Sequence, residues 1–100
     1  MSNLRSLINC HSRKALITGA AGHLGKIISK TLSEIGYDLI LIDLDLDSLK
    51  KLEQDLKQDF KNKIYTFKCN LEIDEERKTL IADLIKNFSN ISCLINNAAF

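Results

Sequence analysis

The sequence of 100 residues contains no proline, no tryptophan and only four glycines. Without prolines, repeats or a low-complexity linker, we expect one structural unit, residues 13–100, preceded by a short leader, residues 1–12. The longest apolar stretches fall well short of the roughly 20 residues of a membrane helix, and the leader has no apolar core long enough for a secretion signal. These absences predict a cytoplasmic protein without a membrane partner.

Neither sign of charge dominates, since the formal net charge is +1. The chain therefore lacks the basic stripe that nucleic-acid binding requires, and we expect no nucleic-acid partner. Its three cysteines show no C-x-x-C spacing, which is typical of free thiols in a reducing compartment. The two histidines, His11 and His23, are too isolated to predict a metal site.

The glycines cluster in residues 15–25, which read Ala-Leu-Ile-Thr-Gly-Ala-Ala-Gly-His-Leu-Gly. A short apolar run leads into three glycines, and a helical pattern follows directly. At such a strand-to-helix turn, backbone N–H groups can bind a phosphate when no side chain blocks them. The segment therefore predicts a nucleotide-binding turn.

The residue types alone permit two other interpretations of these glycines. A phosphate-loop NTPase would need a Ser or Thr after Lys26 to bind Mg²⁺, and Ile27 has no oxygen to offer. A tight turn without any ligand is the alternative for an isolated glycine pattern. The residues that follow weaken this second alternative, because they supply the context of a dinucleotide site.

The segment after the turn predicts a βαβ unit. A helical stripe, expected to pack on a sheet, runs to Gly36 and consists of Leu24, Ile27, Ile28, Thr31, Leu32 and Ile35. Residues 37–43 are continuously apolar in their middle, as in a strand covered on both faces. Asp43 ends this strand, 18 residues after Gly25, close to the roughly 20-residue spacing of a ribose-binding carboxylate.

The rest of the chain continues the alternation of helices and strands. We expect a helix over 46–60 with Asp45 as its N-cap, a strand over 64–68, a helix over 74–87 capped by Asp74, and a strand over 91–95. The last helix has an apolar face of Leu80, Ile81, Leu84, Ile85 and Phe88. Right-handed crossovers give an α/β fold, a Rossmann-type doubly wound parallel sheet of order 3-2-1-4. The glycine turn and the loop after the fourth strand then meet at its ligand-binding switch point.

Three segments together resemble the N-terminal half of a short-chain dehydrogenase/reductase: Thr18–Gly25, Asp43, and residues 94–99, Leu-Ile-Asn-Asn-Ala-Ala. The resemblance covers residues 12–99. His23 stands at the family's middle glycine with Gly22 before it, a spacing closer to the extended, sugar-nucleotide-modifying branch. Ala99 replaces the last glycine of Asn-Asn-Ala-Gly, although the Asn-Asn-Ala core favours the single-domain branch. The branch therefore stays open.

The resemblance implies NAD as cofactor rather than NADP. Asp43 would accept hydrogen bonds from both ribose hydroxyls and repel a 2′-phosphate, and its neighbours include no cation. Asn70 stands where the family has an Asp next to the adenine ring, and a plain turn role is its alternative. His23 lies near the pyrophosphate or is an exposed loop histidine. The expected cofactor-binding residues are Thr18, Gly19, Ala21, Gly22, His23, Leu24, Gly25, Asp43, Leu44, Asn70, Leu71, Asn97, Ala98 and Ala99.

The resemblance further implies hydride transfer between a nicotinamide and a carbonyl or alcohol substrate, in a homo-oligomeric parent. The family's catalytic Tyr-x-x-x-Lys is missing, since neither Tyr37 nor Tyr65 has a lysine four residues on. We therefore expect a sheet truncated after its fourth strand, an inactive cofactor-binding fragment and no catalytic residue. The alternatives are an extended-branch epimerase or dehydratase and a non-catalytic dinucleotide-sensing protein.

Overall fold

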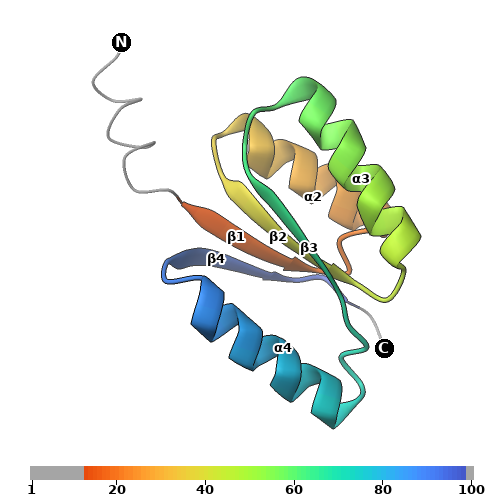
Figure 1. The fold of residues 1–100 in the computed structure, drawn as a ribbon. Helices are drawn as coiled ribbons and strands as arrows, with labels where there is room; N and C mark the ends of the chain where they lie inside the picture. Colours follow the sequence, from red (N-terminus) through yellow and green to blue (C-terminus); the bar gives the residue numbers. More distant parts are fainter. Residues whose placement is uncertain (1–12, 99–100) are drawn as a thin grey trace.

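The computed structural model describes residues 13–98, which form a parallel sheet with helices on both faces (Figure 1). The predicted leader, with Cys10 and His11, and the predicted site residue Ala99 lie outside the described residues. The elements follow one another as β1 (Lys14–Thr18), α2 (His23–Glu34), β2 (Asp38–Asp43), α3 (Leu46–Asp59), β3 (Ile64–Lys68), α4 (Asp74–Asn87) and β4 (Ile91–Asn96).

The four strands are parallel and lie in the order β3-β2-β1-β4, which confirms the predicted Rossmann-type topology. Their register aligns the carboxyl ends. Thr18 of β1 is opposite Ile42 of β2 and Asn96 of β4, and Asp43 is opposite Lys68 of β3. The glycine turn, the end of β2 and the loop after β4 therefore meet at one edge of the sheet.

Helices α2 and α3 cover one face of the sheet and α4 covers the other (Figure 1). Successive side chains of a strand point to opposite faces, so each central strand supplies both cores. Leu39 and Leu41 of β2 pack in the core under α2 and α3, whereas Ile40 and Ile42 pack in the core under α4. The continuous apolar run of β2 is thus explained by burial on both sides.

The face of helix α2 that packs on the sheet overlaps the predicted stripe only in part. Ile28 and Leu32 pack against the core as predicted, and the fully buried residues are Gly25, Ser29 and Ser33. Leu24 and Ile27, which the stripe also included, are more than half exposed at 55% and 52%. Small side chains bring the helix close to the strands, and the Ser29 hydroxyl is satisfied by donating to the Gly25 carbonyl at 2.7 Å. Apolar periodicity located the helix, but small contact residues carry too little hydropathy to mark its packed side.

Helix α4 departs from its prediction at the N-terminus. The predicted cap Asp74 is its first residue instead, and its carboxylate pairs with Arg77 and Lys78. The cap position is Ile73, which makes no side-chain cap hydrogen bond. By contrast, Asp45 caps α3 as predicted, since its carboxylate accepts the Ser48 N–H at 3.1 Å.

The apolar face of α4 is also narrower than predicted. Leu80 is buried and Phe88 packs edge-on against Tyr65 of β3 at 4.7 Å between ring centroids. Ile81 and Ile85 are 52% and 75% exposed. Each follows a packed residue by one position, which rotates it by about 100° around the helix and away from the sheet.

Among residues 13–98, no helix combines the length and the apolar character needed to cross a membrane. The same part of the chain contains no group of three or more His, Cys, Asp or Glu side chains that could hold a metal ion.

Candidate nucleotide-binding site

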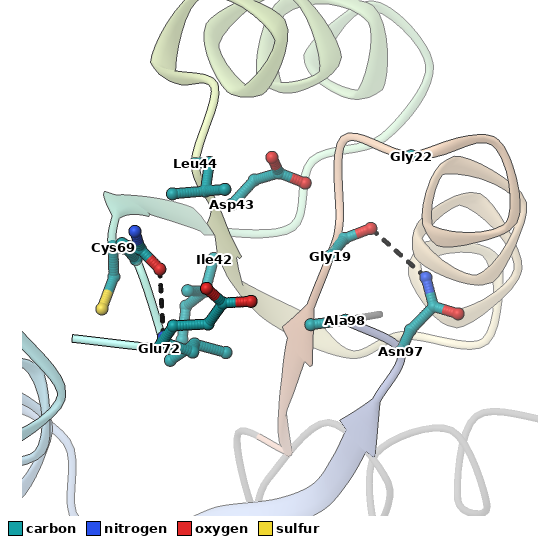
Figure 2. Close-up of a pocket in the computed structure, with 11 residues that line it drawn as sticks. Gly19, Gly22, Ile42, Asp43, Leu44, Cys69, Glu72, Asn97 and Ala98 are labelled. Atoms are coloured by element: carbon teal, nitrogen blue, oxygen red, sulfur yellow. Dashed lines mark hydrogen bonds between the residues drawn. The ribbon is translucent and has the colours of Figure 1, made fainter. Parts of the chain in front are cut away.

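A pocket of about 340 Å³ lies at the carboxyl ends of the strands (Figure 2). Figure 2 shows Gly19 and Gly22 on one side of it and Cys69 and Glu72 on the other, with Asp43 between. The lining residues are Gly19, Gly22, Ile42, Asp43, Leu44, Cys69, Asn70, Leu71, Glu72, Asn97 and Ala98. All of these except Ile42, Cys69 and Glu72 are among the predicted site residues, so the fold brings most of that set together.

Within residues 13–98, five predicted site residues do not line the pocket: Thr18, Ala21, His23, Leu24 and Gly25. His23 is the first residue of α2 and is exposed, as is Leu24. Thr18, Ala21 and Gly25 contact the lining residues through backbone groups and so help to position them.

Thr18 joins the end of β1 to the loop after β4. Its hydroxyl accepts the N–H groups of Asn97 at 3.0 Å and Ala98 at 3.2 Å, and it donates to Oδ1 of Asn96 at 3.0 Å. A hydroxyl has one donor and two acceptor positions, so all its capacity is used. Thr18 therefore sets the position of the Asn97–Ala98 backbone at the pocket wall.

The glycine turn requires glycine at two positions for different reasons. Gly19 has φ +65°, a conformation that side chains rarely adopt, and its carbonyl accepts Asn97 Nδ2 at 3.3 Å. A Cβ on Gly25 would overlap the backbone of Gly19 and Ala20, so Gly25 is needed for the close approach of α2. Gly22 has an ordinary φ of −72°, and a Cβ there would lie 3.3 Å from the Gly19 oxygen.

The turn leaves the N-terminus of α2 open. Gly22, the N-cap residue, makes no side-chain cap hydrogen bond, and the first turn of α2 contains no acidic residue. Unpaired N–H groups and the helix dipole at such an end favour an anion such as a phosphate.

Asp43, at the end of β2, is held by two backbone donors. Its Oδ2 accepts the Ala21 N–H at 3.0 Å, and its Oδ1 accepts the Asp45 N–H at 3.1 Å. A carboxylate has about four lone-pair positions, so each oxygen can accept one further hydrogen bond. Asp43 can therefore accept hydroxyl groups of a ligand in the pocket while it holds the turn in place.

The loop after β3 is fixed by α4. The Asn70 N–H donates to Glu76 Oε1 at 3.0 Å, and Arg77 Nη1 donates to the Leu71 carbonyl at 2.6 Å. Asn70 Oδ1 accepts the Glu72 N–H at 3.0 Å, as in an Asx turn (Figure 2). The turn role of Asn70, one of the two interpretations from sequence, is therefore present in the structure.

Cys69 is a buried free thiol in the pocket wall. Burial raises the pKa of the Cys69 thiol above its ordinary value, and the nearby charge of Glu76 raises it further against the opposing effect of Arg77. The thiol is therefore protonated at neutral pH, and a protonated thiol is a weak nucleophile.

The lining of the pocket is acidic. Asp43 and Glu72 contribute carboxylates, and none of the lining residues is Lys, Arg or His. The larger apolar side chains that line it are Ile42, Leu44 and Leu71. Such a pocket suits an apolar ring that carries hydrogen-bond donors, and its carboxylates disfavour a phosphate group next to them.

Sequence reasoning missed Ile42, Cys69 and Glu72 as lining residues. Ile42, Cys69 and Glu72 each stand next to a residue that was predicted, so the ends of β2 and β3 and the loop that follows carried a signal. The sequence did not indicate that Asn70 Oδ1 accepts the Glu72 N–H and so forms the turn that brings Glu72 to the pocket.

A family model described as short chain dehydrogenase matches residues 13–100. A curated relative, diacetyl reductase [(S)-acetoin forming] of Staphylococcus epidermidis, is 30% identical over 87 residues, which are 87% of this chain and 34% of that protein. The chain thus spans about a third of the length of the curated relatives it matches. Since the match is to dehydrogenases and reductases, the epimerase or dehydratase alternative and the sensor alternative are not favoured.

Solved structures agree with this assignment. The crystal structure of NAD⁺-bound xylitol dehydrogenase is similar with a TM-score of 0.81 and 25% identity, covering 89% of this chain and 34% of that one. A metagenomic short-chain oxidoreductase in complex with NADP shares the fold, with a TM-score of 0.82 at 20% identity over 89% of this chain and 40% of that one. Fold, motifs and the family match over residues 13–100 lead to one conclusion: this chain belongs to the short-chain dehydrogenase family of oxidoreductases.

Proposed function

We propose that this chain is the NAD-binding part of an oxidoreductase that acts on a carbonyl or alcohol substrate. The observation that carries the proposal is the pocket at the carboxyl ends of the strands, which is lined by the glycine turn, Asp43 and apolar side chains. The names of two relatives, a diacetyl reductase and a xylitol dehydrogenase, support carbonyl and alcohol chemistry for the substrate class. The bound nicotinamide would supply the hydride-transfer chemistry.

The glycine turn would hold the pyrophosphate of the cofactor. Gly19 and Gly22 present no side chain to the pocket, and the open N-terminus of α2 supplies N–H donors. Thr18, through Asn97 and Ala98, would hold the loop after β4 against the glycine turn, where Asn97 Nδ2 donates to the Gly19 carbonyl. In this arrangement the described residues bind and orient the cofactor.

Asp43 supports the choice of NAD over NADP. A 2′-phosphate bound beside this carboxylate would meet like charge, and the lining residues offer no cation to neutralise it. The two ribose hydroxyls of NAD would instead donate to the free lone pairs of Asp43. A hydrogen bond to a charged group contributes about 1.5–3 kcal/mol, which corresponds to at least a tenfold preference.

The test is a titration of the 100-residue chain with NADH and with NADPH, followed by nicotinamide fluorescence. We expect saturable NADH binding and at least about tenfold weaker NADPH binding. Equal or tighter NADPH binding would contradict the choice of NAD, and failure of the folded chain to bind either dinucleotide would contradict the proposed function. We expect no turnover of any alcohol or carbonyl by these 100 residues, which contain no Tyr-x-x-x-Lys.

A further inference from the structure

β3 is an edge strand of the described sheet, with β2 on one side only. The Lys63 C=O, just before β3, accepts the Leu39 N–H of β2 at 2.9 Å. Because the direction of the backbone groups alternates along a strand, the N–H and C=O groups of Ile64, Thr66 and Lys68 point away from β2. Such a row of backbone groups is a template for a further strand.

The α4 side of this edge is hollowed. A groove of about 310 Å³ lies between the end of β3 and α4, and its lining residues are Phe67, Lys68, Cys69, Glu75, Glu76, Thr79, Leu80 and Asp83. Phe67 and Leu80 supply apolar surface, and α4 supplies three carboxylates. The groove therefore suits a side chain that has an apolar stem and a cationic end, such as lysine.

Two of the three carboxylates have no cation beside them. Asp74, at the start of α4, pairs with both Arg77 and Lys78. Within residues 13–98, Glu75 and Asp83 form no ion pair. The groove thus presents unpaired negative charge directly beside the open edge of β3.

A second copy of the chain can supply both a strand and a lysine. If the two β3 strands run antiparallel with Thr66 opposite Thr66, the outward backbone groups meet and all five residues of β3 are paired. Residues that lie directly opposite have their side chains on the same face. Tyr65 then meets Phe67 of the second copy, and Cys69 meets Lys63 of the second copy.

In this register Lys63 of the second copy lies at the groove, because Cys69 is one of its lining residues. The Lys63 side chain is exposed and forms no ion pair within the described residues. Its stem can pack along Phe67 while its ammonium group reaches Glu75 and Asp83. The two-fold symmetry of the pairing makes this contact twice.

The aromatic side chains on the α4 face suit the same register. Tyr65 and Phe67 are half-buried, and both pack edge-on against Phe88, with ring centroids at 4.7 and 6.2 Å. Phe88 therefore holds both rings on the face where the second copy places its own Phe67 and Tyr65. Cross-strand aromatic pairs stabilise neighbouring strands.

We propose that the edge of β3 is an interface between two copies of this chain, in which the β3 strands pair antiparallel and each copy places Lys63 in the groove of the other. The interface uses the open backbone groups of β3, the aromatic side chains and the unpaired carboxylates of α4. It goes beyond the proposed function and does not depend on a bound cofactor.

Sedimentation velocity tests the interface in a Leu94→Lys background. Leu94 is 66% exposed on β4, the other edge strand, and this substitution keeps association through β4 out of the measurement. We expect a monomer–dimer equilibrium with a species of twice the 11.3 kDa chain mass. Lys63→Glu should weaken the dimer about tenfold, since repulsion replaces attraction at two symmetric contacts. Lys51→Glu makes the same change at an exposed residue of α3 and should leave the dimer unchanged.

An exchange of charges is the sharper test of the groove. Glu75→Lys combined with Asp83→Lys should also weaken the dimer, because like charges then face each other. Adding Lys63→Glu to this pair of substitutions should restore the dimer, since opposite charges meet again. A role of Lys63 that is confined to its own copy predicts no such restoration.

Thr66→Pro tests the backbone pairing. It removes an N–H that points away from β2, so the chain should fold, as a circular-dichroism spectrum reports, and should no longer form the dimer. Thr66→Val is the matched control, because it loses the same hydroxyl but keeps the N–H, and it should still form the dimer.

Several outcomes would overturn the proposal. A background chain that stays monomeric at all concentrations would show that a second copy does not occupy this edge. A dimer in folded Thr66→Pro, equal effects of Lys63→Glu and Lys51→Glu, or a failure of the charge exchange to restore the dimer would each show that the copies do not meet as described. None of these results bears on NADH binding, which tests the proposed function separately.

Discussion

Asp43 and Ala21 are joined by a hydrogen bond in which the Ala21 N–H donates to Asp43 Oδ2 at 3.0 Å. The carboxylate proposed to bind the ribose therefore also ties the glycine turn to the end of β2. Substitution of Asp43 alters two properties at once, the shape of the turn and the charge beside the ribose. Two variants separate these properties.

Asp43→Asn keeps an oxygen for the Ala21 N–H but removes the charge, whereas Asp43→Ala removes both. We expect both variants to lose the preference for NADH over NADPH, with NADH affinity reduced about tenfold. Asp43→Ala should also lose more stability than Asp43→Asn, by about 1–3 kcal/mol, since it leaves both the Ala21 and the Asp45 N–H unpaired, whereas the amide oxygen of Asn can still accept one of them. Fluorescence titration and urea unfolding measure the two effects. Asp47→Asn, at an exposed position on α3, is the control; an unchanged preference in Asp43→Asn would contradict the role of the charge.

Thr18 offers a second test of how the pocket is built. Thr18→Val leaves the Asn97 and Ala98 N–H groups without their acceptor, so we expect a loss of about 1–3 kcal/mol in the free energy of unfolding. Thr18→Ser keeps the hydroxyl and should lose much less. Thr31→Val is the control, because the Thr31 hydroxyl is exposed and bonds only to the Ile27 carbonyl within α2. Equal losses in Thr18→Val and Thr31→Val, measured in urea, would mean that the link between β1 and β4 contributes little.

The glycine turn predicts a graded response to a single methyl group. Gly25→Ala places a Cβ against the backbone of Gly19 and Ala20, which cannot move without separating α2 from β1. We expect it to lower the melting temperature strongly or prevent folding. Gly22→Ala meets only the Gly19 oxygen at 3.3 Å and has a permitted φ, so it should fold. Thermal melting by circular dichroism distinguishes them, and a normal melt for Gly25→Ala would contradict the close helix approach.

The order of the elements could be predicted because each carries a local signal. The buried run at Leu39–Ile42, the glycine turn and the Asp45 cap all act within a few residues of the chain. The parallel order then follows from the hand of the crossovers. The packed faces of α2 and α4 could be predicted only in part. Ser29 is buried because α2 lies close to the strands, and Ile85 is exposed because it is rotated away from the sheet. The apolar pattern alone encodes neither the distance between helix and sheet nor the width of the packed face.

The residues of the candidate site also differ in how far the sequence predicts them. Gly19, Asp43 and Asn97 stand at strand ends, where the parallel sheet brings them together, and so they could be predicted. Glu72 enters the pocket only through the turn that Asn70 forms with it and the anchoring of that turn by α4. These contacts lie within the loop and the first turn of α4, but they depend on the orientation of individual side chains, which the pattern of residue types does not specify.

The rate at which Cys69 is alkylated reports whether a ligand occupies the pocket. In a Cys10→Ser, Cys93→Ser background it is the single thiol, since the chain has three cysteines. Burial and the Glu76 charge raise its pKa, so less thiolate is present in the folded chain than in the unfolded chain at pH 8. We expect iodoacetamide to alkylate Cys69 more slowly in the folded chain than in urea, and NADH to slow the reaction further because Cys69 lines the pocket. Mass spectrometry follows the reaction; a rate unaffected by saturating NADH would place the cofactor elsewhere.

Leu94 predicts how the chain behaves in solution. β4 is an edge strand of the described sheet. Leu94 on this strand is 66% exposed, whereas Leu16 of the neighbouring β1 is buried. An apolar side chain on an open edge favours pairing with another chain. We expect the 100-residue chain to self-associate, and Leu94→Lys to shift it toward the 11.3 kDa monomer, because a charged side chain on an edge strand opposes such pairing.

Ile35→Lys, which places the same charge at an exposed residue away from the edge, is the control and should not change the association. Sedimentation velocity distinguishes these cases: a monomer for the unchanged chain, or equal effects of the two lysines, would show that the edge of β4 does not drive association.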